Sequence, residues 1–173
     1  RTVGQQYSRS GQVRVAQYLT SVPWVFVVEP HSYLYYPQVR NVIQAIDNKD
    51  RQLPETISFA SNNLSWFVAY QGSLTNLQLA GLTLASIPAA NSQTITVGNL
   101  PSVSSLSYVF KAGDFLQLGL YPYKVTADVL RGSLTTVNVN LHRPVIGTPS
   151  TGTLSGVGNT CTFYVLAEQC PTY

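Results

Sequence analysis

Apolar and polar residues alternate with a period of two through much of the second half of the chain. After a turn signal at Lys111–Asp114, residues 115–118 begin an apolar strand, and residues 121–129 and 137–141 alternate clearly. A period of two is the spacing of side chains that share one face of a β-strand. Arg131–Ser133, between the last two stretches, is a hairpin signal. The pattern predicts an antiparallel meander that closes into a small barrel or sandwich.

One stretch of the first half has the period of a helix instead. Between Val39 and Ile46, apolar residues recur at positions i, i+3, i+4 and i+7, which is one stripe along a helix. Pro37 suits a first helical turn, because proline lacks the backbone N–H that is unpaired there anyway. We therefore expect one short α-helix over about residues 37–48.

The other apolar runs of the first half predict strands. Trp24–Val28 has the pattern of a strand buried on both faces. Residues 57–59, 66–70 and 94–97 indicate further strands. The leucines between residues 74 and 84 have partly helical spacing, but the glycines around them favour strands broken by turns. The predicted fold is mainly β, an antiparallel sandwich or small barrel with one short α-helix.

A Pro- and Ser-rich link at residues 99–107 suggests where the chain divides. It predicts an N-terminal β-rich domain with the helix over residues 1–98 and a C-terminal meander or small barrel over residues 108–173, with one continuous domain as the alternative. The polar first twenty residues suggest an arm or an edge strand. The Gly-, Thr- and Ser-rich stretch 147–160 suggests a long loop or arm, and we expect both arms to contact neighbouring subunits, because ordering them needs a partner surface.

The composition narrows the class of protein. Charged residues make up 10 % of the 173 residues, against about 25 % in a typical soluble domain. No apolar run reaches the roughly 18 residues of a membrane span, and the net charge of +3 is scattered, so we expect neither a membrane nor a nucleic-acid partner. So few charges protect a free monomer poorly against association, and we expect partners to cover much of the surface. The chain begins at Arg1 and contains no Met, which suggests a processed chain or a fragment of a longer one.

Residues with reactive side chains are few and dispersed. His31 and His142 lie in no metal-binding or nucleophile motif, and hydrogen-bonded packing is the ordinary role for both. Cys161 and Cys170 flank a predicted strand that holds them about 30 Å apart, so two free thiols are expected, as suits a reducing compartment. We therefore expect that the protein is not an enzyme and that it binds no cofactor. We assign no catalytic, cofactor-binding or metal-ligating residue.

Tyrosine is unusually frequent, and three of the eleven cluster between two prolines. In the favoured interpretation Tyr33 and Tyr35 pack on the core face and Tyr36 is partly exposed. In the alternative the three rings form a protein interface or a carbohydrate platform, because rings offer large area at low entropy cost. Together with Trp66, Tyr33, Tyr35 and Tyr36 are the candidate interface residues.

Five stretches carry a resemblance to a known group of proteins. They are Tyr35–Pro37, Gln44–Arg51, Lys111–Gln117, Tyr123–Val129 and Leu141–Pro144. In combination they resemble structural proteins of contractile-tailed bacteriophages, particularly myoviruses of cyanobacteria. The resemblance covers most of the chain in patches and carries over no catalytic residue.

The resemblance implies a virion structural protein, a subunit of a phage tail or baseplate that acts through subunit–subunit contacts. Its partners would be other copies of itself, in a homo-oligomer, and other tail or baseplate proteins. Its location would be the virion, assembled in the host cytoplasm. A carbohydrate- or receptor-binding β module, of a phage or a secreted protein, is the alternative. A hydrolase with dispersed catalytic residues ranks last, because it would need a cleft that brings a histidine against a carboxylate.

Overall fold

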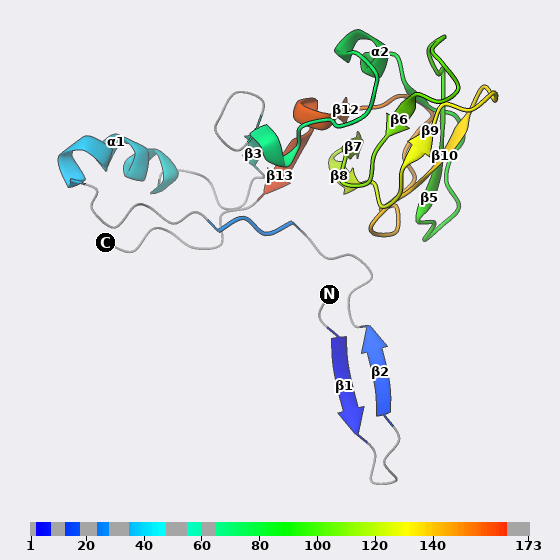
Figure 1. The fold of residues 1–173 in the computed structure, drawn as a ribbon. Coiled ribbons are helices and arrows are strands. Elements are labelled where there is room, and N and C mark those ends of the chain that lie inside the picture. Colours follow the sequence, from blue (N-terminus) through cyan, green and yellow to red (C-terminus); the bar gives the residue numbers. More distant parts are fainter. Residues whose placement is uncertain are drawn as a thin grey trace.

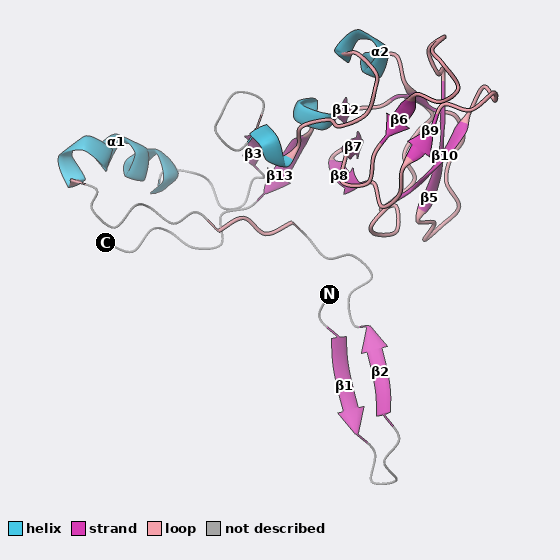
Figure 2. Ribbon diagram, viewed as in Figure 1, coloured by secondary structure: helices cyan, strands magenta, loops and turns pink. Residues whose placement is uncertain are grey.

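The computed structural model describes residues 3–7, 13–17, 24–27, 35–47, 55–59 and 65–165. Strands outnumber helices and pair antiparallel throughout these residues (Figures 1 and 2). The expectation of a mainly β, antiparallel fold is confirmed. The sheets do not close into a barrel over the described part of the chain.

The expected helix is present, and a second one was missed. Helix α1 spans Tyr36–Asp47. The prediction of strands alone around the leucines 74–84 was wrong, because α2 spans Asn76–Ala80 before β4 begins. A capping box starts α2: the Thr75 hydroxyl accepts from Gln78 N at 3.4 Å, and Gln78 Oε1 accepts from Thr75 N at 2.8 Å. This reciprocal cap provides acceptors for the backbone N–H groups of Thr75 and Gln78 in the first turn. The spacing of the leucines does not indicate such a cap.

The strands group into several small sheets. The largest sheet has the order β10 (Val137–Asn140), β5 (Thr94–Gly98), β4 (Thr83–Leu84) and β11 (Gly152–Thr153). The next has the order β12 (Gly156–Val157), β7 (Phe115–Leu118) and β8 (Tyr121–Lys124). Three pairs complete the set: β6 (Tyr108–Phe110) with β9 (Val129–Leu130), β13 (Thr162–Val165) with β3 (Glu55–Ser58), and β1 (Val3–Tyr7) with β2 (Val13–Gln17).

The expected meander is only partly present. Strands β7 and β8 form the predicted hairpin, with Phe115 opposite Lys124. The alternating stretch 121–129 is not one strand, because regular pairing stops after Lys124 and a single bridge joins Val125 to Leu141. Strand β10 pairs with β5, which precedes the link 99–107. The chain on both sides of that link therefore contributes to one sheet.

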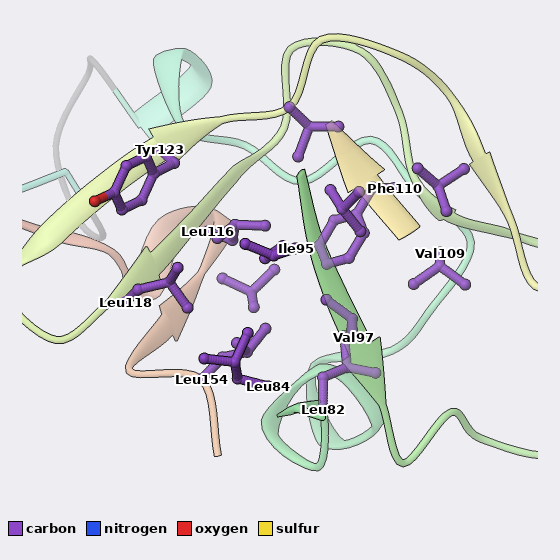
Figure 3. Packing of buried hydrophobic residues seen from close by; sticks show 14 of the residues in the cluster. Leu82, Leu84, Ile95, Val97, Val109, Phe110, Leu116, Leu118, Tyr123 and Leu154 are labelled. Atoms are coloured by element: carbon purple, nitrogen blue, oxygen red, sulfur yellow. The ribbon is translucent and has the colours of Figure 1, made fainter. Parts of the chain in front are cut away.

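An aliphatic core, here called the main core, lies between these sheets (Figure 3). Figure 3 shows Ile95 and Val97 of β5 together with Leu116 and Leu118 of β7 in the interior. Leu82, Val109, Phe110 and Tyr123 are among the fully buried side chains that complete it.

The segment 147–160 is part of this core. The prediction of a loop or arm that needs a partner was wrong, because β11 pairs with β4 and β12 pairs with β7. Leu154 and Val157 from this segment are buried in the main core. Within the chain, β11 and β12 find their backbone partners and Leu154 and Val157 are buried, whereas much of the rest of the segment is exposed.

A second, smaller group of side chains is mostly aromatic, and it is called the aromatic cluster below. Its buried members are Phe59, Val68, Phe115, Cys161 and Phe163, with Trp24, Phe26, Ile57, Phe67 and Val165 packed against them. The prediction that Trp24–Val28 is a strand buried on both faces was wrong for the described residues 24–27, which form no strand. Trp24 and Phe26 are half-buried, whereas Val25 and Val27 are 72 % and 77 % exposed.

The structure also tests the predictions for residues 66–70 and for Cys161. Residues 66–70 were expected in a strand, but Ser65–Phe67 forms the short helix η1. Cys161 is a buried free thiol, as expected. Burial raises its pKa to about 12, so the thiolate form is suppressed. Cys170 lies outside the described residues.

Candidate functional site

The described candidate interface residues are exposed. Tyr35 is 67 % exposed, Tyr36 51 % and Trp66 70 %. The favoured core interpretation of Tyr35 was therefore wrong: Tyr35 directly precedes α1 and its ring faces solvent. Tyr35 and Tyr36 are neighbours at the start of α1, whereas Trp66 belongs to η1 and packs edge-on against Phe67 with ring centroids 6.3 Å apart. Tyr33 lies outside the described residues.

Further large apolar side chains face outward on the main β body. They are Leu77, Ile87, Leu106, Leu120, Tyr121, Leu130, Leu134 and Tyr164. Leu77 in α2 is 87 % exposed, the highest value among them. Leu130 and Leu134 border an open surface hollow of about 410 Å³. Singly exposed apolar residues are ordinary on the surface of a folded protein.

The turn Lys111–Asp114, part of the resemblance, holds two distant segments together. Asp114 is 1 % exposed, and its carboxylate accepts from Gln71 N and Lys111 N, both at 2.8 Å. Burial raises the pKa of Asp114, while these two hydrogen bonds oppose the rise. The backbone O of Asp114 also accepts from Val125 N at 2.8 Å. Asp114 is thus a structural anchor of this turn.

The stretches 123–129 and 141–144 meet next to the turn Lys111–Asp114. Tyr123 Oη accepts from Ile146 N at 2.8 Å, and His142 Nδ1 accepts from Lys124 N at 3.0 Å. Arg143 is buried, donates from Nη2 to Pro122 O at 3.1 Å, and lies 5.1 Å from the centre of the Tyr123 ring. The three stretches of the resemblance in this half of the chain therefore interlock within the fold.

The same environment decides the protonation of His142. Burial and the nearby positive charge of Arg143 lower its pKa to about 4. The ring is neutral at pH 7 and accepts a backbone hydrogen bond, which is the packing role expected from the sequence. His31, the other histidine, lies outside the described residues.

The larger surface hollow offers no acid–base chemistry. It measures about 520 Å³, is open to solvent and lies between η1, the start of α2 and Asn159. Tyr70 is the one titratable residue in its lining, and burial raises its pKa to about 12. The Tyr70 hydroxyl donates to Val109 O at 2.6 Å, which ties it to the β6 strand. The side chains that line the hollow supply uncharged hydrogen-bonding groups.

The described residues contain no group of three His, Cys, Asp or Glu side chains placed to hold a metal ion. Nor does any helix in the described part of the chain have the length and apolarity to cross a membrane. Comparison of the chain with protein-family models, with curated proteins and with solved structures produced no match.

The sequence interpretation missed the role of Trp24 and Phe26. The Trp24 indole donates to Pro122 O at 3.1 Å, and its ring lies 5.5 Å from that of Phe115 and 5.2 Å from that of His142. Phe26 lies 5.2 Å from Phe163. A signal was available, because large rings alternate with valines in this segment. The alternation was missed because tryptophan, phenylalanine and valine all count as apolar when residues are divided only into apolar and polar.

Proposed function

We propose that this protein is a structural subunit of a virion, part of a phage tail or baseplate, and that it works through contacts with other copies of itself and with neighbouring tail or baseplate proteins. The observation that carries the proposal is the set of large apolar side chains left exposed on a chain with 10 % charged residues, Leu77, Trp66 and Leu134 foremost. Burial of such side chains between subunits is favourable by roughly 25 cal/mol per Å² of apolar surface.

The geometry of the resembling stretches agrees with a structural role. Asp114, Tyr123, His142 and Arg143 have their polar groups directed at backbone atoms of the same chain. These residues hold the fold and leave the outer surface for partners. The absence of a match in the comparisons leaves the proposal to rest on the resemblance and on the surface.

The first experiment asks whether the chain belongs to the particle. Virions purified from the phage that encodes the chain are analysed by mass spectrometry, and the chain is located by electron microscopy with a labelled antibody. We expect many copies at the tail or baseplate. A chain that infected cells produce but that purified virions lack would contradict the proposal.

The second experiment asks whether the exposed residues make the contacts. Leu77→Ser, Trp66→Ser and Leu134→Ser are expected to reduce incorporation into particles or self-association, measured by light scattering after size-exclusion chromatography. Thr94→Ser, on the exposed polar end of β5, is the matched control and should leave both unchanged. A wild-type chain that stays monomeric at high concentration and whose particles assemble equally well with all three serine variants would contradict the proposal.

The exposure of Tyr35 and Tyr36 also supports a second candidate, a carbohydrate- or receptor-binding module. Glycan-array binding by the purified chain that Tyr35→Ala and Tyr36→Ala abolish would favour this function. If the wild-type chain and both variants give the same background signal, this candidate is discarded.

A further inference from the structure

The larger surface hollow, of about 520 Å³, has a lining without charge. None of its lining residues is acidic or basic, and Tyr70, whose pKa is raised to about 12, keeps its proton at pH 7. The smaller hollow differs, because Asp128 and Arg131 belong to its lining. An uncharged lining gives a phosphate, a metal ion or a charged side chain no ionic partner. The size and the polarity of the larger hollow therefore suit a small neutral ligand.

Three polar side chains around the larger hollow have hydrogen-bonding capacity that the described part of the chain does not use. The Ser65 hydroxyl and the amide groups of Asn76 and Asn159 line the hollow, and none of them has a hydrogen-bond partner among the described residues. They come from η1, from the first residue of α2 and from η2, which spans Gly158–Thr160. Each amide offers two donor hydrogens and an acceptor oxygen, and the hydroxyl both donates and accepts. The hollow thus brings together donors and acceptors that a ligand can use.

The Tyr70 side chain forms a fixed wall of the hollow. Its hydroxyl donates to Val109 O at 2.6 Å and accepts from Leu74 N at 3.3 Å. Two glycines lie directly against it: a Cβ at Gly72 would overlap the Tyr70 hydroxyl, and a Cβ at Gly158 would lie 2.9 Å from Tyr70 Cβ. Such close packing leaves the ring little freedom to move. The wall is therefore preformed, which lowers the entropy cost of binding a ligand.

We propose that the larger hollow is a binding site for a neutral saccharide. Sugar hydroxyl groups both donate and accept hydrogen bonds, which matches the amides of Asn76 and Asn159 and the hydroxyl of Ser65. The C–H face of a sugar ring is apolar, and the aromatic ring of Tyr70 offers it a large contact surface. A peptide fits less well, because peptide recognition relies on pockets for apolar side chains, and Leu74 in this lining is only 6 % exposed.

The site is tested on the whole chain by saturation-transfer difference NMR, which detects weak binding. The probes are free mannose, glucose, galactose and N-acetylglucosamine with their disaccharides, and N-acetylneuraminic acid and glucuronic acid are the charged comparison. We expect saturable transfer to at least one neutral sugar, and weaker transfer to both acids. If no neutral sugar receives saturation, or if the acids are preferred, the proposal is wrong.

Variants of the lining locate the bound sugar. Asn76→Ala and Asn159→Ala each remove one hydrogen-bonding group and should weaken binding by about fivefold, and the double variant should weaken it further. Ala69→Leu places a larger side chain in the hollow and should abolish binding. Gln93→Ala is the matched control, because Gln93 is an exposed amide outside the lining, and it should leave the affinity unchanged.

Circular dichroism establishes that each variant is folded. Asn76 and Asn159 are exposed, so their truncation should not disturb the core. If Ala69→Leu does not fold, the double amide variant decides the question by itself. A folded double variant that binds the sugar as tightly as the wild-type chain would overturn the proposal.

These tests are separate from the tests of the proposed function. The inference goes beyond the structural role, and the hollow includes neither Tyr35 nor Tyr36. A chain found in virions that binds no neutral sugar would keep the proposed function and lose this site. Sugar binding that Tyr35→Ala abolishes and that the double amide variant retains would assign the sugar to the start of α1 and overturn this proposal.

Discussion

The main core and the aromatic cluster are both apolar, but they are enclosed in different ways. In the main core, side chains such as Val97 and Leu116 are completely buried between strands whose backbones pair with one another. In the aromatic cluster, the outer layer is Trp24 and Phe26, which remain half-buried and come from a segment outside any described strand.

This difference predicts a difference in local stability. Backbone pairing and full burial place the main core among the last parts of the structure to open, whereas a layer held by a few side chains opens at lower cost. Apolar composition alone therefore does not define a core. The hydrogen-bond pairing of the surrounding backbone also determines how cooperatively a buried region unfolds. The predictions below test this contrast, in order of decreasing effect.

The largest effect is expected from Phe110→Ala. Phe110 is fully buried in the main core, so its loss should lower the free energy of unfolding by about 3–5 kcal/mol in urea titrations. Phe26→Ala removes a half-buried ring of the aromatic cluster and should cost about 1 kcal/mol. Equal costs for the two variants would show that both regions unfold as one unit and would remove the contrast.

Asp114→Ala should rank second. It leaves the partly buried hydrogen bonds from the backbone amides of Gln71 and Lys111 without their acceptor, at a cost of about 2–4 kcal/mol. Asp128→Ala is the matched control, because Asp128 is exposed and accepts a single bond from Ala112 N at 2.8 Å. Thermal melts should show a small change for Asp128→Ala. If the control destabilised as much as Asp114→Ala, burial would not be the reason for the anchor's strength.

Gly132→Val should have a smaller effect. Gly132 has a φ of 57° in the turn between β9 and β10, a conformation that strains a β-branched residue by about 1–3 kcal/mol. A Cβ at this position would have open space around it, so the cost is conformational and not a clash. Ser133→Val, next to it, should change the melting temperature much less. Gly132→Val should leave the fluorescence of Trp24 unchanged below the melting transition, when it is measured in a Trp66→Phe background.

The smallest effect is expected from acid acting on His142, whose ring touches both regions, 5.2 Å from Trp24 and 6.3 Å from Tyr123. Its pKa is lowered to about 4 in the fold, so the unfolded chain takes up a proton first as the pH falls below about 6.5. The contribution of His142 therefore destabilises the fold progressively between pH 6.5 and 4, and not above this range.

Melting temperatures over this pH range check the prediction. His142→Gln, which can still accept from Lys124 N, should flatten the profile. A His142→Gln profile as steep as that of the wild type would assign the pH dependence to other groups.

Local pattern was enough to predict several elements. The helical stripe located α1 to within a residue or so at each end. Apolar runs located β5 and β7, and alternation located β10 and the start of β8. The turn before Phe115 followed from its residue types, and Gly113 has the positive φ that such a turn uses. Of the two described tyrosines among the candidate interface residues, Tyr36 is exposed as expected, whereas Tyr35 was expected in the core and is exposed as well.

Side-chain periodicity was thus sufficient to locate several strands and the longer helix, because it is a property of neighbouring residues. Only the tertiary structure decided that β10 pairs with β5, that Leu154 and Val157 enter the main core, and that Trp24 turns inward while Val25 turns outward. The physical reason is that strand partners and burial depend on contacts across many tens of residues. An alternation with a period of two shows that a stretch can form a strand, but it does not indicate which other strand pairs with it.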